Sequence, residues 1–140
     1  MFFFKIILIS TIFLSINSLA NNDFVVAVSK KSTINQLSKN DIAKLFLSKI
    51  KSFPNGEKAI TIEINNKESQ INFYKELTNK NEKQLSKYWA KMIFTGRGIP
   101  PKKLEKESEL IEFIAKNKNA ITYIKRKYLS KDLKIVWEKN

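Results

Sequence analysis

The stretch Tyr88-Trp89-Ala90-Lys91-Met92-Ile93-Phe94-Thr95-Gly96-Arg97-Gly98-Ile99-Pro100-Pro101 decides the fold, because it begins as an amphipathic helix and ends in a sharp turn. The strongest helical periodicity in the chain belongs to five apolar residues of this region, Leu85, Tyr88, Trp89, Met92 and Ile93. Their i, i+3, i+4, i+7, i+8 spacing places them on one helix face. We therefore expect this face, with Trp89 at its centre, to lie in the core.

The turn that ends this helix has two interpretations. The chain contains three glycines, and two of them, Gly96 and Gly98, flank Arg97. Gly96 can cap the helix before the prolines stop it. Alternatively, the guanidinium and the backbone around Thr95 can bind an anion, because glycine lets the backbone approach closely and arginine offers five donors. Both interpretations remain open from the sequence.

Composition excludes several classes of function. The formal net charge is +13, with neither cysteine nor histidine. Zinc sites built on cysteine and histidine, Ser-His-Asp triads and Cys-His pairs are therefore excluded. The lysines are spread over every segment, and the densest basic run is only Lys125-Arg126-Lys127. We expect a basic protein with a solvated surface and no nucleic-acid partner.

The N-terminus has the pattern of a signal peptide over residues 1–20. Lys5 supplies a positive charge, residues 6–16 form a short apolar run, and Ser18-Leu19-Ala20 places small residues at a cleavage site. An uncleaved anchor is the alternative, although the run is short for a membrane span. We expect a periplasmic or otherwise exported protein whose residues 21–140 form one domain.

The remaining chain alternates strands and helices. Apolar runs predict strands at 24–28, 60–64, 120–124 and 134–137, and helical spacing predicts helices at 41–50, 71–77, 81–93 and 110–114. Ile60, Ile62 and Ile64 alternate with Thr61 and Glu63, which indicates a half-buried strand. This order favours an α/β fold with a mixed, mostly parallel sheet and flanking helices.

Polar residues after two predicted strands are candidate ligand contacts. Ser29 ends the first strand, and the loop 65–70, which contains Lys67 and Ser69, joins the second strand to a helix. Anions bind well at helix N-termini. The alternatives are an ordinary turn at Ser29 and an ordinary helix cap in the loop.

Three segments, 41–53, 73–101 and 119–124, resemble the small single-lobe members of the phosphate ABC transporter substrate-binding-protein-like family. The resemblance covers nearly all of residues 24–125. It implies a single three-layer lobe of the type 2 periplasmic binding protein fold. It also implies a possible phosphate or similar oxyanion ligand and a membrane transport or sensory complex as partner.

The sequence departs from the family at two motifs. The family's glycine-rich phosphate loop corresponds to residues 65–70, which contain no glycine, arginine or aspartate. Ser69 matches the family's serine if a small gap is allowed, and Lys67 takes that place without one. The Gly-Ala-Ile-Gly-Tyr signature of the family is here Asn119-Ala120-Ile121-Thr122-Tyr123.

Two functions follow as hypotheses. The first is an exported solute-binding module for phosphate or a similar oxyanion, with seven candidate ligand contacts, Ser29, Lys67, Ser69, Thr95, Gly96, Arg97 and Gly98. Of these, we expect Arg97, the backbone N–H groups of residues 95–98 and the loop at Ser69 to converge in one depression. The second is an accessory protein-interaction or sensory module with a degenerate ligand site. No nucleophile and base have usable spacing, so an enzyme is not expected, and neither is a cofactor or metal. The sequence leaves the oligomeric state open.

Overall fold

The computed structural model describes residues 23–140, and the predicted signal peptide lies outside this part of the chain. The strands are β1 (Phe24–Ser29), β2 (Ile60–Ile64), β3 (Lys102–Leu104), β4 (Ala120–Lys125) and β5 (Leu133–Glu138), in the spatial order β3-β2-β4-β1-β5. β2 pairs in parallel with β3 and β4, whereas β1 is antiparallel to β4 and β5. Four strands therefore run in one direction and β1 runs in the other, which confirms the mixed sheet.

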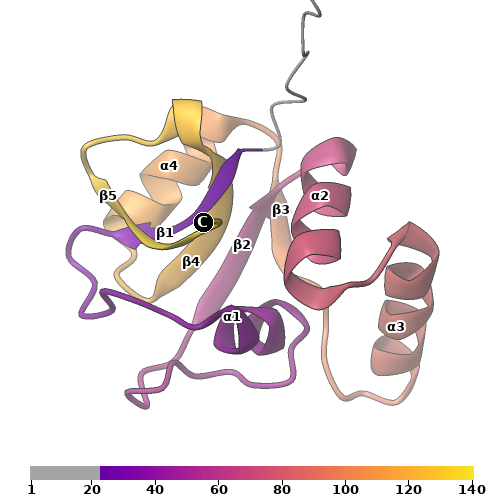
Figure 1. Ribbon diagram of the computed structural model, residues 1–140. Helices are drawn as coiled ribbons and strands as arrows, with labels where there is room; N and C mark the ends of the chain where they lie inside the picture. Colours follow the sequence, from indigo (N-terminus) through magenta and orange to yellow (C-terminus); the bar gives the residue numbers. More distant parts are fainter. Residues whose placement is uncertain (1–22) are drawn as a thin grey trace, which may run out of the picture.

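The helices are α1 (Lys39–Phe46), α2 (Lys67–Thr78), α3 (Glu82–Phe94) and α4 (Glu107–Lys116), with a short 3₁₀ turn at Arg126–Tyr128. Side chains of Ser38, Asn66 and Asn81 accept a backbone N–H and so cap α1, α2 and α3. α4 covers one face of the sheet, α1 and α2 cover the other, and α3 lies beyond α2 (Figure 1). Within residues 23–140, no helix combines the length and apolar character that crossing a membrane requires.

The core has one hydrophobic cluster on each face of the sheet. Alternation along β1 sends Val26 and Val28 to the α1 and α2 face and Val25 and Ala27 to the α4 face. Trp89 is 8% exposed and belongs to the first cluster, as its helical spacing predicts. The described residues 23–140 supply a packed hydrophobic cluster to each face of the sheet.

One strand was not predicted, and two predictions about these elements are wrong. The short strand β3 was absent from the predicted strands, and its lysines suit a charged strand at the edge of a sheet. β2 is not half-buried: Glu63 is fully buried, because helices cover both faces of the sheet. Ile93 is 56% exposed rather than in the core, because α3 lies at the margin of the molecule.

Candidate functional site

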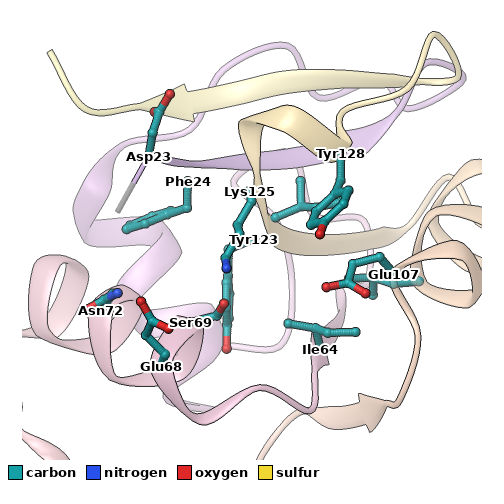
Figure 2. A pocket seen from close by; sticks show the side chains of 12 residues that line it. Asp23, Phe24, Ile64, Glu68, Ser69, Asn72, Glu107, Tyr123, Lys125 and Tyr128 are labelled. Carbon is teal, nitrogen blue, oxygen red and sulfur yellow. The ribbon is translucent and has the colours of Figure 1, made fainter. Parts of the chain in front are cut away.

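A pocket lies where β2 and β4 end, and we call it the strand-end pocket. α2 begins directly after β2 and α4 directly after β3, so two helix N-termini face this edge of the sheet. The pocket is shallow: the space among its lining atoms is about 460 Å³ when open solvent is counted, and about 20 Å³ of it admits the centre of a water molecule. Figure 2 shows its lining. The lining residues are Asp23, Phe24, Ile64, Glu68, Ser69, Asn72, Glu107, Leu110, Tyr123, Ile124, Lys125 and Tyr128.

Among residues 23–140, Lys125 is the single cation that lines this pocket. It ends β4, and its side chain points toward the centre of the pocket, with Glu68 and Glu107 on opposite sides (Figure 2). None of these three side chains forms a hydrogen bond or ion pair with the described part of the chain. The pocket therefore offers one ammonium and two carboxylates to a ligand.

The third acidic residue of the lining is already paired. Asp23 accepts a hydrogen bond from Arg126 Nε at 2.9 Å, and Arg126 also binds Glu138 on β5. This ion-pair network ties the start of β1 to the 3₁₀ turn and to β5. Asp23 therefore forms part of the pocket wall, and its carboxylate is already occupied by Arg126.

A buried carboxylate lies beneath the pocket. The Tyr123 ring lines the pocket, but its hydroxyl points away from it and donates to Glu63 Oε2 at 2.9 Å (Figure 2). Gln70 Nε2 donates to Oε1 at 3.3 Å, and the Tyr74 hydroxyl lies 3.3 Å from Oε2. Burial raises the pKa of Glu63 above its usual range, against the opposing effects of the Tyr123 hydrogen bond and the Lys103 charge.

The same cluster fixes the protonation of its tyrosines. Burial, followed by the nearby Glu63 charge, raises the pKa of both Tyr74 and Tyr123. Both hydroxyls therefore stay protonated, and the Tyr123 proton is directed to Glu63. Tyr123 supplies the pocket with an aromatic wall that also stacks on Phe73, with ring centroids 3.9 Å apart.

Of the residues predicted to bind a ligand, the strand-end pocket contains Ser69. Its backbone N–H donates to the Asn66 side chain at 2.9 Å, so Asn66 caps the helix and the Ser69 hydroxyl is left to face the pocket. Lys67, one turn away, forms a 2.8 Å ion pair with Glu82 at the start of α3. Both groups of this pair are more than half exposed, so the pair adds little stability.

Ser29 lies at the opposite end of the strands from the strand-end pocket. β1 is antiparallel to β4, so the end of β1 lies beside the beginning of β4. The Ser29 hydroxyl donates to the Ala115 carbonyl at 3.1 Å and accepts from Lys31 N at 3.1 Å. Ser29 is 1% exposed, and the structure gives it the turn role that was the alternative from sequence.

The turn at residues 95–98 is a helix C-cap. Thr95 N donates to Lys91 O, Gly96 N to Ile93 O and Arg97 N to Met92 O. The last two bonds, with Gly96 at φ +64°, form a Schellman motif. These three N–H groups are therefore used by α3 carbonyls and are not free for an anion. Gly98 has a different role, because a Cβ there would lie 2.7 Å from Ser48 Cβ.

The predicted convergence of loop 65–70 with residues 95–98 is wrong. β2 and β3 are parallel, with Ile62 opposite Lys102. Ser69 follows the end of β2, whereas Arg97 precedes the beginning of β3, so the two lie at opposite edges of the sheet (Figure 1). Arg97 instead lines a separate depression with Lys49 and Lys91. The order of elements could not reveal this separation without the strand pairing.

Sequence reasoning missed Lys125, Glu68 and Glu107 as pocket residues. A rule was available for Lys125, because it ends a predicted strand on the edge where α/β proteins bind ligands. It was interpreted instead as part of a basic surface run. Within residues 23–140, no group of three or more acidic side chains could hold a metal ion.

No family model matches the sequence, and no curated protein matches it. Solved structures resemble the fold over 81% of this chain. A putative phosphate ABC transporter substrate-binding protein from Clostridium perfringens, with bound phosphate, aligns with a TM-score of 0.61 at 14% identity. A possible phosphate binding protein from Planctomyces limnophilus aligns with a TM-score of 0.59 at 12% identity. An ABC-type phosphate transport receptor from Vibrio cholerae aligns with a TM-score of 0.53 at 10% identity.

The alignments cover 44%, 40% and 45% of those three chains, so this chain spans less than half of their length. At such low identity, the likeness concerns the fold. It confirms the resemblance inferred from the sequence motifs and the three-layer α/β lobe. The chain shares the fold of these phosphate ABC transporter substrate-binding and phosphate-binding proteins, over less than half of their length.

Proposed function

We propose that this protein is a solute-binding module that takes a protonated oxyanion, hydrogen phosphate first, in the strand-end pocket. The observation that carries the proposal is the Lys125 ammonium, which points into this pocket without a partner in the described chain. The pocket also lies where parallel strands end, the usual ligand position in α/β folds. The solved proteins of similar fold are described as phosphate-binding or phosphate-transport proteins.

The carboxylates of the pocket define the ligand further. Ionised Glu68 and Glu107 can only accept hydrogen bonds, so they repel an anion that has no proton to donate. Phosphate carries one or two protons at neutral pH, whereas sulfate carries none. Lys125 and the Ser69 hydroxyl can then hold unprotonated oxygens while a carboxylate accepts the ligand's proton. We therefore propose selectivity for phosphate over sulfate.

Weak binding is expected from one lobe. The pocket is open on one side, so solvent and salt screen the charge interactions. Phosphate should therefore bind with a Kd on the order of 0.1–1 mM, which corresponds to about 4–5.5 kcal/mol. A second lobe from another chain would close the pocket and tighten binding.

Isothermal titration with phosphate and sulfate tests this proposal. Lys125→Ala should abolish detectable phosphate binding. Lys127→Ala, a nearby exposed lysine whose ammonium lies over the Tyr128 ring, is the matched control and should retain it. Arg97→Ala should also retain it, because Arg97 is at the opposite edge. Equal affinity for sulfate and phosphate would contradict the role of the carboxylates, and loss of binding in Arg97→Ala alone would contradict the pocket.

Export belongs to the same proposal. It rests on the pattern at Lys5, residues 6–16 and Ser18-Leu19-Ala20, and the proteins of similar fold are transporter binding proteins. The mass of the protein recovered from the producing cell tests it. Removal of residues 1–20 is the expected result, and an intact Met1 in the membrane fraction would contradict cleavage. The alternative interaction-module function draws on a different region, the exposed turn after α3.

A further inference from the structure

The end of α3 exposes three large apolar side chains close together in the chain. Phe94 is 92% exposed, Ile99 is 74% exposed and Ile93 is 56% exposed. Ile93 and Ile99 line one depression with Gly96 and Gly98. We call residues 93–99 the α3 turn. Isolated exposed apolar residues are ordinary, but a cluster of three with a nearly fully exposed phenylalanine marks an interaction surface.

Cations surround the α3 turn. The two depressions beside the turn are lined by four cations, which we call the basic rim, Lys49, Lys51, Lys91 and Arg97. No carboxylate of the described residues lines either depression. All four side chains are exposed and form no ion pair with the described residues. The two contributing segments, 42–56 and 83–104, contain nine basic residues and no acidic one. The surface is therefore apolar at its tip and uniformly positive around it.

The α3 turn is held in place rather than loosely exposed. The Ser48 hydroxyl donates to Ile99 O at 2.8 Å, and Gly98 lies against Ser48 so closely that a Cβ would not fit. The Tyr88 hydroxyl donates to Leu47 O at 2.6 Å and ties α3 to the end of α1. Met92 and Tyr88 pack on the core beneath. The apolar side chains therefore project from a backbone that is already held in place, so docking orders the side chains but little of the backbone.

We propose that the α3 turn docks the protein on an anionic phospholipid surface. Phe94, Ile93 and Ile99 would enter the boundary between headgroups and acyl chains, and the basic rim would contact lipid phosphates. Apolar burial and attraction to anionic lipid act together in this way at membrane surfaces. Each lysine or arginine near such a surface strengthens the attraction, which extends over about a Debye length.

A lipid surface fits this region better than a protein partner. A stable protein interface buries roughly 800 Å² on each partner, and its centre is depleted of lysine. Here three apolar side chains project, and three of the four rim cations are lysines. Lysine keeps its hydration, which suits it to a hydrated headgroup layer more than to a dry protein interface. The surface also lies at the opposite edge from the strand-end pocket, so docking would leave that pocket open (Figure 1).

Vesicle co-sedimentation tests the proposal with residues 21–140, which contain the whole described fold and omit the apolar N-terminus. Vesicles of pure phosphatidylcholine are compared with vesicles that contain phosphatidylglycerol at roughly one third. We expect binding to the anionic vesicles alone, with loss at high salt. Phe94→Ser with Ile99→Ser should weaken binding at least about tenfold through lost apolar burial. Lys49→Ala with Lys91→Ala should weaken it by about the same factor.

Lys106→Ala with Lys127→Ala is the matched control, because these exposed lysines follow the ends of β3 and β4 on the opposite side and their removal takes away the same charge. This pair should leave binding unchanged. Phe94 and Ile99 are exposed, so urea melts of their variants should match the wild type and exclude misfolding. Absence of binding to anionic vesicles overturns the proposal. Equal loss in the control pair also overturns it, because attraction would then depend on total charge. Capture of an acidic protein through the α3 turn, without vesicle binding, would assign the surface to a protein partner instead.

Discussion

The strand-end pocket and the α3 turn occupy opposite edges of one small sheet and present opposite chemistry. The pocket is concave, and one ammonium, two carboxylates and one hydroxyl face it. The buried Glu63 carboxylate and its hydrogen-bond partners lie beneath it. The α3 turn protrudes, with three apolar side chains inside a rim of cations. The direction of the strands explains the shapes, because strands end and helices begin around the pocket, whereas the α3 turn is a helix end held by α1. One lobe can therefore offer a ligand surface and a docking surface without competition between them.

The largest expected effect separates two aromatic residues of the same helix. Trp89→Ala should lower the free energy of unfolding by roughly 3–5 kcal/mol, because it empties a core position. Phe94→Ala should change it by less than about 0.5 kcal/mol, because Phe94 is almost fully exposed. Urea denaturation of both variants measures this difference. Similar losses would show that the α3 turn is part of the core and not a free surface.

The next effect tests whether α1 fixes the α3 turn. Gly98→Ala should cost about 1–3 kcal/mol, because its Cβ would meet Ser48 Cβ at 2.7 Å and Met92 Cε at 3.1 Å. In Gly96→Ala the new Cβ would contact no neighbouring atom. The free energy of unfolding should therefore fall by about 1–2 kcal/mol, from the left-handed backbone conformation alone. Ser48→Gly removes the Ser48–Ile99 hydrogen bond and the positive φ of a serine in both backgrounds. Its additional gain in Gly98→Ala over Gly96→Ala, in the same denaturation assay, therefore measures relief of the close contact. Failure of this rescue would contradict close packing of the turn on α1.

A smaller effect concerns the buried carboxylate beneath the pocket. Burial raises the folded-state pKa of Glu63, so its stability contribution is complete below the unfolded pKa of about 4.3 and falls as pH rises through the folded pKa. Glu63→Gln should remove this fall. Its free energy of unfolding, relative to wild type, should therefore increase between pH 4 and pH 7 in urea melts.

Glu112→Gln is the control with the opposite sign. The Lys116 hydrogen bond lowers the pKa of this exposed carboxyl, so its contribution is present above the unfolded pKa and disappears in acid. Relative to wild type, this variant should lose rather than gain stability as pH rises. If the difference in free energy of unfolding between Glu63→Gln and wild type did not change with pH, Glu63 would have an ordinary pKa in the folded state. The site beneath the pocket would then be more hydrated than the structure indicates.

The fold could be predicted from the sequence where periodicity was strong. The α3 helix, its Gly96 cap and the buried strand at 24–28 follow from residue spacing and turn chemistry. Glu63 could not be placed, because alternation shows which face a residue points to but not whether a helix covers that face. The strand β3 was missed because two of its three residues are exposed lysines on a sheet edge.

The candidate site was less predictable than the fold, for a physical reason. Ser69 was found because a polar loop between a strand and a helix is a local feature. Its distance from Arg97 depends on the parallel pairing of β2 with β3, which is a long-range property. Arg97 is an exposed cation in a glycine turn, as the sequence indicates, but the turn's N–H groups already cap α3. Local motifs therefore left the grouping of the candidate residues undetermined.

The central claim is that phosphate binds in the strand-end pocket and not at the α3 turn. A phosphate titration of ¹⁵N-labelled residues 21–140, read at each backbone amide, tests this claim most directly. The titration is followed by NMR at about 0.15 M salt, so that nonspecific attraction to lysines is screened. We predict saturable shifts at Glu68, Ser69 and Lys125 and none at residues 93–99. Saturable shifts at residues 95–98, with none at Ser69 and Lys125, would contradict the account and assign anion binding to the α3 turn.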